Sequence, residues 1–442
     1  MIMKEDIKTN IGGTVCLLND SFPPLIDGVA NAVLNYAKYI SNNGGSAVVI
    51  TPNHPNADDK KYQYPIMRYP SIDVRKKVGY MAGIPFSPDI ARQLKTKNVQ
   101  LLHSHCPVVS TMFARQLRQI VDAPLILTYH TKFDIDIANI IKNKALQSGS
   151  KKILLENINA CDEIWTVSKG AGDNLRSLGY EGEYIIMPNG VDLPRKRVSD
   201  EIIAAATNGY NLPSNCPVYL FVGRMMWYKG LKIIADAMAK LKADNKEFRM
   251  VFVGDGTDRA EIEAYAKQNN IFDKCIFTGP IHDRELLRGW YCRADLFLFP
   301  STFDTNGLVV REAAASSLAS VLIKNSCAAE GIKDGVNGFI IEENSDSLYE
   351  CLTNLYNNRQ KMKSVGVCAG EQLYLSWEDA VKNANARYQV VIEQYKSGSK
   401  KTYRKPIEYF FKANGELMGD LGDLLDLHEQ LQNHIQDTHR FL

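Results

Sequence analysis

The sequence lacks the features that would place it in a secreted, membrane-spanning or metal-binding class. Its nine cysteines show no paired spacing and their number is odd, which argues against a disulfide framework or a zinc site. We therefore expect reduced thiols in a cytoplasmic protein. The stretch MIMKEDIKTN carries acids and no apolar core, so no signal peptide is expected there. No run approaches the roughly 18 apolar residues that span a bilayer, so we expect any membrane contact to be peripheral, at the inner face.

A surplus of one charge is also absent. The formal net charge is +2, which gives no general attraction to nucleic acid. The first 200 residues hold 24 Lys and Arg against 19 Asp and Glu, a net of +5 that leaves −3 for the rest. This small excess of positive charge weakly indicates that the N-terminal half binds an anionic partner. Neither a Gly-x-Ser-x-Gly elbow nor a Walker motif occurs, and no His, Asp or Glu cluster has metal-ligand spacing, so we expect no metal and no cofactor.

The sequence does contain short apolar runs that alternate with helical patterns, in two successive series. The first series is TVCLLND, SAVVIT, VQLLHSH, APLILTYH and EIWTVS, and the second is PVYLFVG, FRMVFVG, KCIFTG, LFLFP and SVLI. Runs rich in β-branched residues, bounded by Gly and Pro, are typical of parallel strands buried on both faces. The sequence therefore predicts an α/β protein with two doubly wound domains in tandem.

Breaks in this pattern indicate the domain boundaries. We expect a first domain over residues 1–195, a second over 215–375 with a linker near 193–215, and a helix over 376–396. Residues 397–442 begin with the basic connector SGSKKTYRKP and continue with apolar residues at helical spacing. These apolar residues include Leu424, Leu425, Leu427 and Leu431. The tail either packs as a helix on the body, a partner or a second subunit, or stays half ordered.

Two carboxylates lie eight positions apart in the segment FDTNGLVVRE. On a helix Asp304 and Glu312 would be roughly 12 Å apart, which is too far to flank one scissile bond. The spacing suits a nucleotide sugar, with its diphosphate over the backbone amides of Asn306, Gly307 and Leu308. The alternative is an ordinary helix start, in which Asp304 is the N-cap and Glu312 lies on a solvated face.

Two cations follow the expected strand PVYLFVG. Arg224 and Lys229 come just after its carboxyl end, where open α/β sheets bind ligands, and they could neutralise a departing diphosphate. The alternative is two surface cations. The next strand is followed by Gly254 and Gly256, which by themselves indicate no more than a tight turn. The stretch HDRELLRGWYCRAD is interpreted as a helix capped by Asp283.

The first domain offers weaker candidates. Gly28 lies where a helix is expected to begin, so an anion could approach the backbone there, but a turn glycine is an equal alternative. His103 and His105 end the expected strand VQLLHSH, and His130 lies at the end of APLILTYH. A lone histidine in such a place is more often structural than catalytic, and the polar neighbours of His130 leave both interpretations open.

Together these segments make the chain resemble the retaining glycosyltransferases of family 4, which have the GT-B fold of two Rossmann-like domains with a cleft between them. The resemblance is found in PPLIDGVANAVLNYA, TYHTKFD, VSKGAGDNL, MPNGVDL, GRMMWYKG, VGDGTD, FPSTFDTNGLVVREAAA and IKDGVNGF. These segments span nearly all of residues 14–396 in family order. The family hallmark, Glu followed by seven residues and a second Glu, stands here as Asp304 and Glu312.

The resemblance implies a role for each matching residue. Asp304 would contact hydroxyls of the donor sugar, Glu312 would contact the ribose, and His130 would lie by the reacting centre. Arg224 and Lys229 would hold the diphosphate. The remaining residues implied in donor binding are Gly28, Ser168, Gly254, Gly256, Asn306, Gly307, Leu308, Val309 and Glu330.

Three residues depart from the family pattern. Asp304 is one methylene shorter than the usual Glu, and Asn306 replaces a common aromatic residue. Ser317 stands where the family often has Gly. None of these changes removes a needed charge. They are expected to alter which sugar is used, and they slightly favour an inactive relative.

The acceptor is expected to bind the first domain. In VRKKVGYMAGIPFSP (Val74–Pro88), Arg75, Lys76 and Lys77 beside apolar residues would suit anionic headgroups and acyl chains, whereas a solvated loop is the alternative. TYHTKFDIDIANI resembles lipid glucosyltransferases that act on diacylglycerol. The expected reaction is therefore transfer of a hexose from a UDP-hexose to a membrane lipid, although the residues alone leave the base and the hexose open. The alternatives are an epimerase, an oligo- or polysaccharide-forming transferase, and a non-catalytic partner protein that binds nucleotide sugars.

Overall fold

The computed structural model describes residues 11–25, 27–75, 79–133, 143–398 and 406–440. The chain forms two compact units. Unit 1 comprises Met1–Val167, Ala171–Pro188 and Trp377–Leu442, and unit 2 comprises Ser168–Gly170 and Asn189–Ser376. The main division therefore falls seven residues before the predicted boundary at 195.

Unit 1 is built on a seven-stranded sheet in which every neighbouring pair is parallel. The strands are β1 (Thr14–Leu18), β2 (Ser46–Pro52), β3 (Ile66–Tyr69), β6 (Val99–Ser104), β7 (Leu125–Tyr129), β8 (Glu163–Thr166) and β9 (Ile185–Ile186). Their order is β3-β2-β1-β6-β7-β8-β9, so the winding reverses between β1 and β6. Every residue of β1, β7 and β8 is buried, as expected for strands covered on both faces.

Helices connect these strands, together with one antiparallel hairpin of β4 (Ser71–Asp73) and β5 (Met81–Gly83). The helices are α1 (Gly28–Asn42), α3 (Pro88–Lys95), α4 (Val109–Val121), α6 (Lys144–Asn159), α7 (Lys169–Ser177), α15 (Trp377–Lys396) and α16 (Pro406–Arg440). The helix expected over residues 376–396 is α15, which packs on α1. Its Tyr388 stacks on Trp165 of β8 with 5.2 Å between the ring centroids, so this late segment completes the core of unit 1.

Unit 2 is built on a six-stranded sheet, again parallel throughout. The strands are β10 (Val218–Val222), β11 (Arg249–Val253), β12 (Cys275–Gly279), β13 (Leu296–Phe299), β14 (Ser320–Ile323) and β15 (Phe339–Ile341). The helices are α8 (Asp200–Thr207), α9 (Leu231–Ala243), α10 (Arg259–Gln268), α11 (Arg284–Arg293), α12 (Leu308–Ala315), α13 (Ser345–Leu355) and α14 (Arg359–Gln372). The order β12-β11-β10-β13-β14-β15 places the reversal of winding between β10 and β13. Open α/β sheets bind ligands beyond the carboxyl ends of the strands at such a point.

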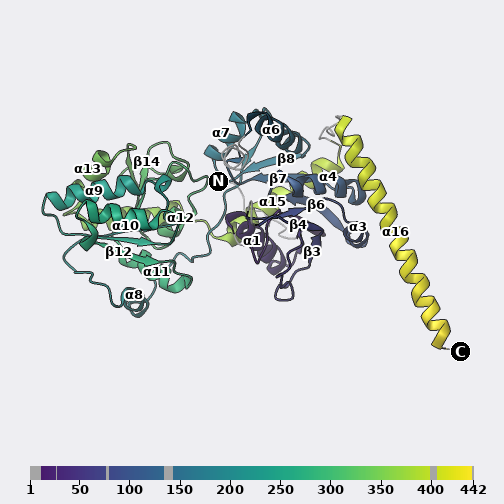
Figure 1. Ribbon diagram of the computed structural model, residues 1–442, viewed down its shortest axis with the longest axis horizontal. Coiled ribbons are helices and arrows are strands. Elements are labelled where there is room, and N and C mark those ends of the chain that lie inside the picture. Colours follow the sequence, from purple (N-terminus) through teal and green to yellow (C-terminus); the bar gives the residue numbers. More distant parts are fainter. Residues whose placement is uncertain (1–10, 26, 76–78, 134–142, 399–405, 441–442) are drawn as a thin grey trace, which may run out of the picture. The chain divides into compact units, whose positions relative to one another are not determined.

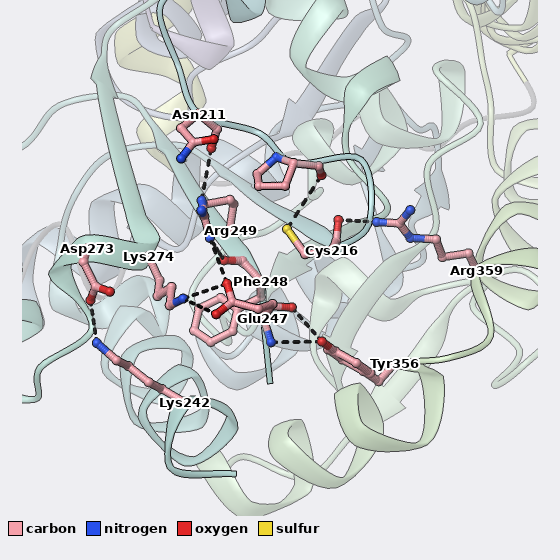
Figure 2. A network of polar contacts seen from close by, with 11 residues as sticks. Asn211, Cys216, Lys242, Glu247, Phe248, Arg249, Asp273, Lys274, Tyr356 and Arg359 are labelled. Atoms are coloured by element: carbon pink, nitrogen blue, oxygen red, sulfur yellow. Dashed lines mark hydrogen bonds and ion pairs between the residues drawn. The ribbon is translucent and has the colours of Figure 1, made fainter. Parts of the chain in front are cut away.

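The amino edge of this second sheet is braced by a polar network (Figure 2). Lys274, just before β12, contacts both carboxylate oxygens of Glu247 at 2.6 and 2.7 Å. The Tyr356 hydroxyl donates to the backbone carbonyl of Glu247 and accepts from its amide, both at 2.9 Å. These contacts hold together the segments that lead into β11 and β12. The amino edge is therefore occupied by structural contacts, and the carboxyl edge is the place to look for a functional site.

The predicted linker over residues 193–215 contains a helix that the sequence analysis did not anticipate. α8 packs on α11, and its Ile203 is buried beside Cys292. Gly289 of α11 allows this close contact, because a Cβ at that position would lie 2.6 Å from the Cβ of Ala206. The short helix α8, which lies between two polar segments, is thus packed into unit 2.

The tail forms α16, which runs along α3 and α4 and is drawn in yellow in Figure 1. Phe411 is 3% exposed, and the guanidinium carbon of Arg115 lies 3.8 Å from its ring centroid. Arg92 of α3 contacts Asp426 at 3.0 Å and Glu429 at 2.8 Å. Of the two alternatives for the tail, the described residues form the packed helix. Its exposed apolar residues are Tyr409, Phe410, Leu417, Leu424, Leu425 and Leu427.

Two glycines of α16 provide a matched test of this packing. A Cβ at Gly415 would lie 2.6 Å from the backbone oxygen of Gln116 in α4, whereas a Cβ at Gly419 would meet only the flexible end of Lys95 at 3.5 Å. Gly419→Ala is expected to stabilise the helix by about 1 kcal/mol through helix propensity. Gly415→Ala is expected to weaken docking by about 1–3 kcal/mol, because a backbone atom cannot move aside cheaply.

Amide hydrogen exchange across α16 measures the difference between the two variants. We expect faster exchange in Gly415→Ala and unchanged or slower exchange in Gly419→Ala. Equal exchange in the two variants would mean that α16 does not pack on α4 through Gly415.

Candidate functional site

The loops that follow β10 and β13 are neighbours at the carboxyl edge of the unit 2 sheet, because these two strands pair. Lys229 ends a short 3-10 turn, Trp227–Lys229, and is only 6% exposed. Its Nζ lies 2.6 Å from Oδ1 of Asp304. The hydroxyl of Ser301 donates to the other carboxylate oxygen of Asp304 at 2.7 Å. The structure thus brings two predicted residues together, and it adds Ser301, which the sequence analysis did not identify.

Asp304 does not cap the helix that follows it, so that alternative was wrong. The N-cap of α12 is Gly307, which has no side chain to cap the first turn. Gly307 has a φ of +55°, a left-handed conformation that glycine adopts without the penalty of a Cβ. The first amides of α12, which include those of Leu308 and Val309, have no acceptor within the helix. An anion could therefore approach them over Gly307.

Glu312 does not lie on a solvated face either. Its side chain is 13% exposed, and it accepts from Nη2 of Arg284 at 2.7 Å and from the Tyr291 hydroxyl at 3.0 Å. Both donors belong to α11, which Asp283 caps as predicted. Burial raises the pKa of Tyr291 well above its usual range, so its hydroxyl remains a donor. Glu312 is thus held in a fixed orientation by two residues that the sequence analysis left without a role.

A small cavity of about 20 Å³ lies at the start of α12. Its lining includes the predicted residues Ser168, Asn306, Gly307 and Glu330. Both polar atoms of the Asn306 side chain are buried and have no hydrogen-bond partner among the described residues. The carboxylate of Glu330 accepts from the amides of Lys169 and Gly170 at 2.8 and 2.5 Å, so Glu330 braces the cavity wall. The space matches one water-sized group, which the Asn306 amide could bind.

Gly254 and Gly256 are explained by the packing of one loop on another. A Cβ at Gly254 would lie 2.0 Å from the backbone oxygen of Gly223, and a Cβ at Gly256 would lie 2.4 Å from that of Met225. Only glycine fits such close backbone contacts. These contacts fix the chain on either side of Arg224, whose side chain is exposed. Both glycines therefore position the loop that contains Arg224.

In unit 1, Gly28 is the first residue of α1, and nothing lies within 4 Å of where its Cβ would be. Beside it, the Asp27 carboxylate accepts from the amides of Val29 and Ala30 at 2.8 and 2.7 Å, and from the Ser21 hydroxyl at 2.7 Å. This acidic N-cap already serves two of the amides that an anion would need. The amide of Gly28 itself is the group left for the predicted anion contact.

His130 directly follows β7 and is 5% exposed. Its Nε2 lies 3.0 Å from Nδ1 of His105, which follows the adjacent strand β6. Burial lowers the pKa of His130 to about 3, so the ring is neutral near pH 7. A neutral imidazole can bind a hydroxyl group but adds no positive charge to a site.

Ser317, the third departure from the family pattern, lies just after α12 with a φ of +56°. A residue with a Cβ is uncommon in this left-handed region, which glycine occupies freely. The substitution therefore adds local backbone strain at the end of the helix.

Among the described residues, no group of three or more His, Cys, Asp and Glu side chains could hold a metal ion. A search of the same residues finds no helix with the length and apolarity needed to cross a bilayer.

Comparison with known families gives two matches. The model described as "Glycosyltransferase Family 4" matches residues 26–195, and the model described as "Glycosyl transferases group 1" matches residues 204–369. A GDP-mannose-dependent alpha-mannosyltransferase of Corynebacterium glutamicum is 26% identical over 338 residues, which cover 74% of this chain and 76% of the relative. An alpha-monoglucosyldiacylglycerol synthase of Acholeplasma laidlawii is 22% identical over 361 residues, 79% of this chain and 89% of the relative.

The solved structures agree with these matches at the level of the fold. HepE of Anabaena, solved in complex with UDP-glucose, has a TM-score of 0.61 at 16% identity and covers 88% of this chain and 99% of that chain. Likeness at this identity bears on the fold alone, and together with the two parallel sheets it confirms the predicted GT-B architecture. α16 lies beyond both family models.

Proposed function

This chain belongs to glycosyltransferase family 4, and from that membership we propose that it is a retaining transferase that moves a hexose from a nucleotide diphosphate sugar to a hydroxyl acceptor. One observation supports this above all: Lys229, Asp304 and the uncapped start of α12 lie at the carboxyl ends of β10 and β13. A cation and free amides suit a diphosphate, and a carboxylate suits sugar hydroxyls. All three belong to one unit.

The diphosphate is proposed to bind Lys229 and the first amides of α12. An ammonium group has three hydrogens, and Asp304 accepts one of them, which leaves two for phosphate oxygens. The exposed guanidinium of Arg224 could fork onto the same anion. These groups act most strongly when negative charge grows on the departing diphosphate, so they stabilise the transition state more than the bound donor.

In unit 2, Asp304 is proposed to bind sugar hydroxyls and Glu312 the ribose. In unit 1, the neutral His130 is separately proposed to bind a substrate hydroxyl. The acceptor hydroxyl would enter on the face from which the diphosphate leaves. A new bond forms between the anomeric carbon and the acceptor oxygen as the bond to the phosphate oxygen breaks, and the acceptor proton passes to that leaving oxygen. This scheme needs neither a strong protein base nor a metal ion.

The acceptor is proposed to be a membrane lipid with a free hydroxyl, such as diacylglycerol, reached by peripheral contact at the inner face of the membrane. Support comes from the relative named as a monoglucosyldiacylglycerol synthase. Exposed apolar side chains around the β4–β5 hairpin add to it: Ile72, Tyr80 and Ile84. Arg75 contacts Asp73 at 2.6 Å, which leaves less free charge for anionic headgroups than the sequence predicted. Lys76 and Lys77 lie outside the described residues.

Thermal unfolding with UDP-glucose, UDP-galactose and GDP-mannose tests donor binding. UDP-glucose is the proposed donor, because HepE is solved with it, and the mannosyltransferase relative makes GDP-mannose its competitor. A donor at about 100 times its dissociation constant is expected to stabilise the fold by about 2.7 kcal/mol. Glu312→Gln should reduce this gain, whereas Glu350→Gln, exposed on α13, should keep it.

Transfer is then measured with dioleoylglycerol in mixed micelles, where an α-linked glucosyl lipid is the expected product. Long oligosaccharides would identify a polymerase instead. Stabilisation by a donor without transfer to lipid or water would identify a binding protein. Absence of both stabilisation and product with all three donors would contradict the proposal.

A further inference from the structure

Three histidines form a buried row at the carboxyl ends of β6 and β7 in unit 1. His103, His105 and His130 are 0%, 1% and 5% exposed. The rings of His103 and His105 lie 4.1 Å apart between centroids, and those of His105 and His130 lie 5.2 Å apart. Burial lowers the pKa of all three, so each ring is neutral near pH 7 and has one N–H and one bare nitrogen.

The contact between His105 and His130 needs one proton between the two nitrogens. Nδ1 of His105 lies 3.0 Å from Nε2 of His130, so one of these nitrogens donates and the other accepts. The second nitrogen of His105, Nε2, is buried and has no hydrogen-bond partner among the described residues. The rings of Tyr36 and His105 pack at a steep angle, with 5.1 Å between their centroids.

The burial of Nε2 of His105 decides which of the two histidines donates the hydrogen bond. If His130 donated, the proton of His105 would be on Nε2, and a buried N–H would have no acceptor. If His105 donates, its Nε2 is a bare nitrogen, which lacks only a donor. Buried N–H groups without acceptors are rarer and costlier than acceptors without donors. The proton between the rings therefore belongs to Nδ1 of His105.

We infer that His105 is a positioning residue that holds His130 in the form protonated on Nδ1. With its Nε2 occupied as an acceptor, a neutral His130 has its only proton on Nδ1. His130 is then a hydrogen-bond donor at Nδ1 and cannot act as a base through Nε2. A role of His130 in binding a substrate hydroxyl rests on the proposed function. The assignment of its proton to Nδ1 does not rest on that function.

His103 is held independently and serves as a control within the same row. Its Nδ1 lies 2.6 Å from the Tyr388 hydroxyl, and its Nε2 lies 2.7 Å from the Thr128 hydroxyl. Hydroxyl groups can donate or accept, so His103 is satisfied with its proton on either nitrogen. A change at His103 disturbs the packing of the row without removing the hydrogen bond to His130.

Long-range ¹H–¹⁵N spectra of the full chain labelled at its eight histidines test the inference directly. At pH 7 we expect His130 to be protonated on Nδ1 and bare at Nε2. His105→Leu removes the donor, so the ¹⁵N signal of His130 Nε2 should move toward that of a bare nitrogen without a hydrogen bond, whereas His105→Asn keeps an amide donor near the position of Nδ1 and should preserve the wild-type signal. His103→Asn should also preserve it. A wild-type His130 protonated on Nε2 would overturn the inference, even if a variant fails to fold.

Kinetics separate this inference from the proposed function. Loss of an orienting partner typically lowers activity by about 10–100-fold, so we expect that loss of kcat/KM in His105→Leu and substantial recovery in His105→Asn. Wild-type protein without transfer activity would contradict the proposed function, while the spectra would still decide the protonation of His130. An active wild type with unchanged activity in His105→Leu would refute the positioning role.

Discussion

Lys229→Ala is expected to lower kcat by roughly 10²–10³-fold, the usual cost of removing one preorganised donor from a developing negative charge. Lys229 is the buried cation of the pair that follows β10, 6% exposed, and its ammonium group is fixed by Asp304 at 2.6 Å. In the proposed mechanism its effect falls mainly on kcat, because the charge that Lys229 would meet is largest on the departing diphosphate. Initial rates at saturating donor measure this effect.

Lys232 provides the matched control for this variant. It lies on α9, its side chain is 60% exposed, and its Nζ pairs with Asp236 at 2.8 Å. Exposed pairs of this kind contribute little, so Lys232→Ala should retain the wild-type kcat. Thermal unfolding of both variants distinguishes lost function from lost fold. Near-normal turnover of a folded Lys229→Ala protein would remove Lys229 from the mechanism.

Unit 1 is expected to lose stability steeply as the pH falls below about 6.5. Burial lowers the folded-state pKa of His103, His105 and His130, to about 3 for His130, whereas each titrates near its ordinary value in the unfolded chain. The unfolded state therefore binds more protons across this window. The stability is present above the unfolded pKa and is lost below it, by about 1.4 kcal/mol per pH unit for each histidine.

All three histidines together would remove about 4 kcal/mol per pH unit, and one carboxyl group opposes them. Burial raises the pKa of Asp20, so the folded state takes up a proton there first and the fall is less steep. Urea unfolding at pH 7, 6 and 5 measures the slope. His105→Gln removes one titrating group, so it should reduce the change of unfolding free energy by about 1.4 kcal/mol per pH unit. His282→Gln, an exposed position in unit 2, should leave this slope unchanged. An unfolding free energy that does not change with pH would contradict a buried neutral row.

The sequence predicted the fold well because parallel strands covered on both faces appear as continuous apolar runs. LFLFP and PVYLFVG became β13 and β10, and the helix expected over residues 376–396 became α15. α8 was missed, since eight residues are fewer than the window in which helical periodicity can be recognised. Elements long enough to show a period were thus predictable, and short ones between polar turns were not.

The site was predicted less completely, because its contacts depend on strand order. Arg284 and Tyr291 lie 28 and 21 residues before Glu312, and no local periodicity relates these positions. Ser301 was overlooked for a different reason, since a serine three residues before an acid is also common in ordinary turns. His103 and His105 did give a usable signal, because alternate residues of a strand share one face.

The close contacts of Gly254 and Gly256 with the backbone oxygens of Gly223 and Met225 have a consequence for how this protein can diverge. These two glycines fix the backbone on either side of Arg224, although they need not contact a ligand themselves. A new side chain at either position would push the neighbouring loop outward and take the guanidinium with it. This pair of loops can therefore change only in concert.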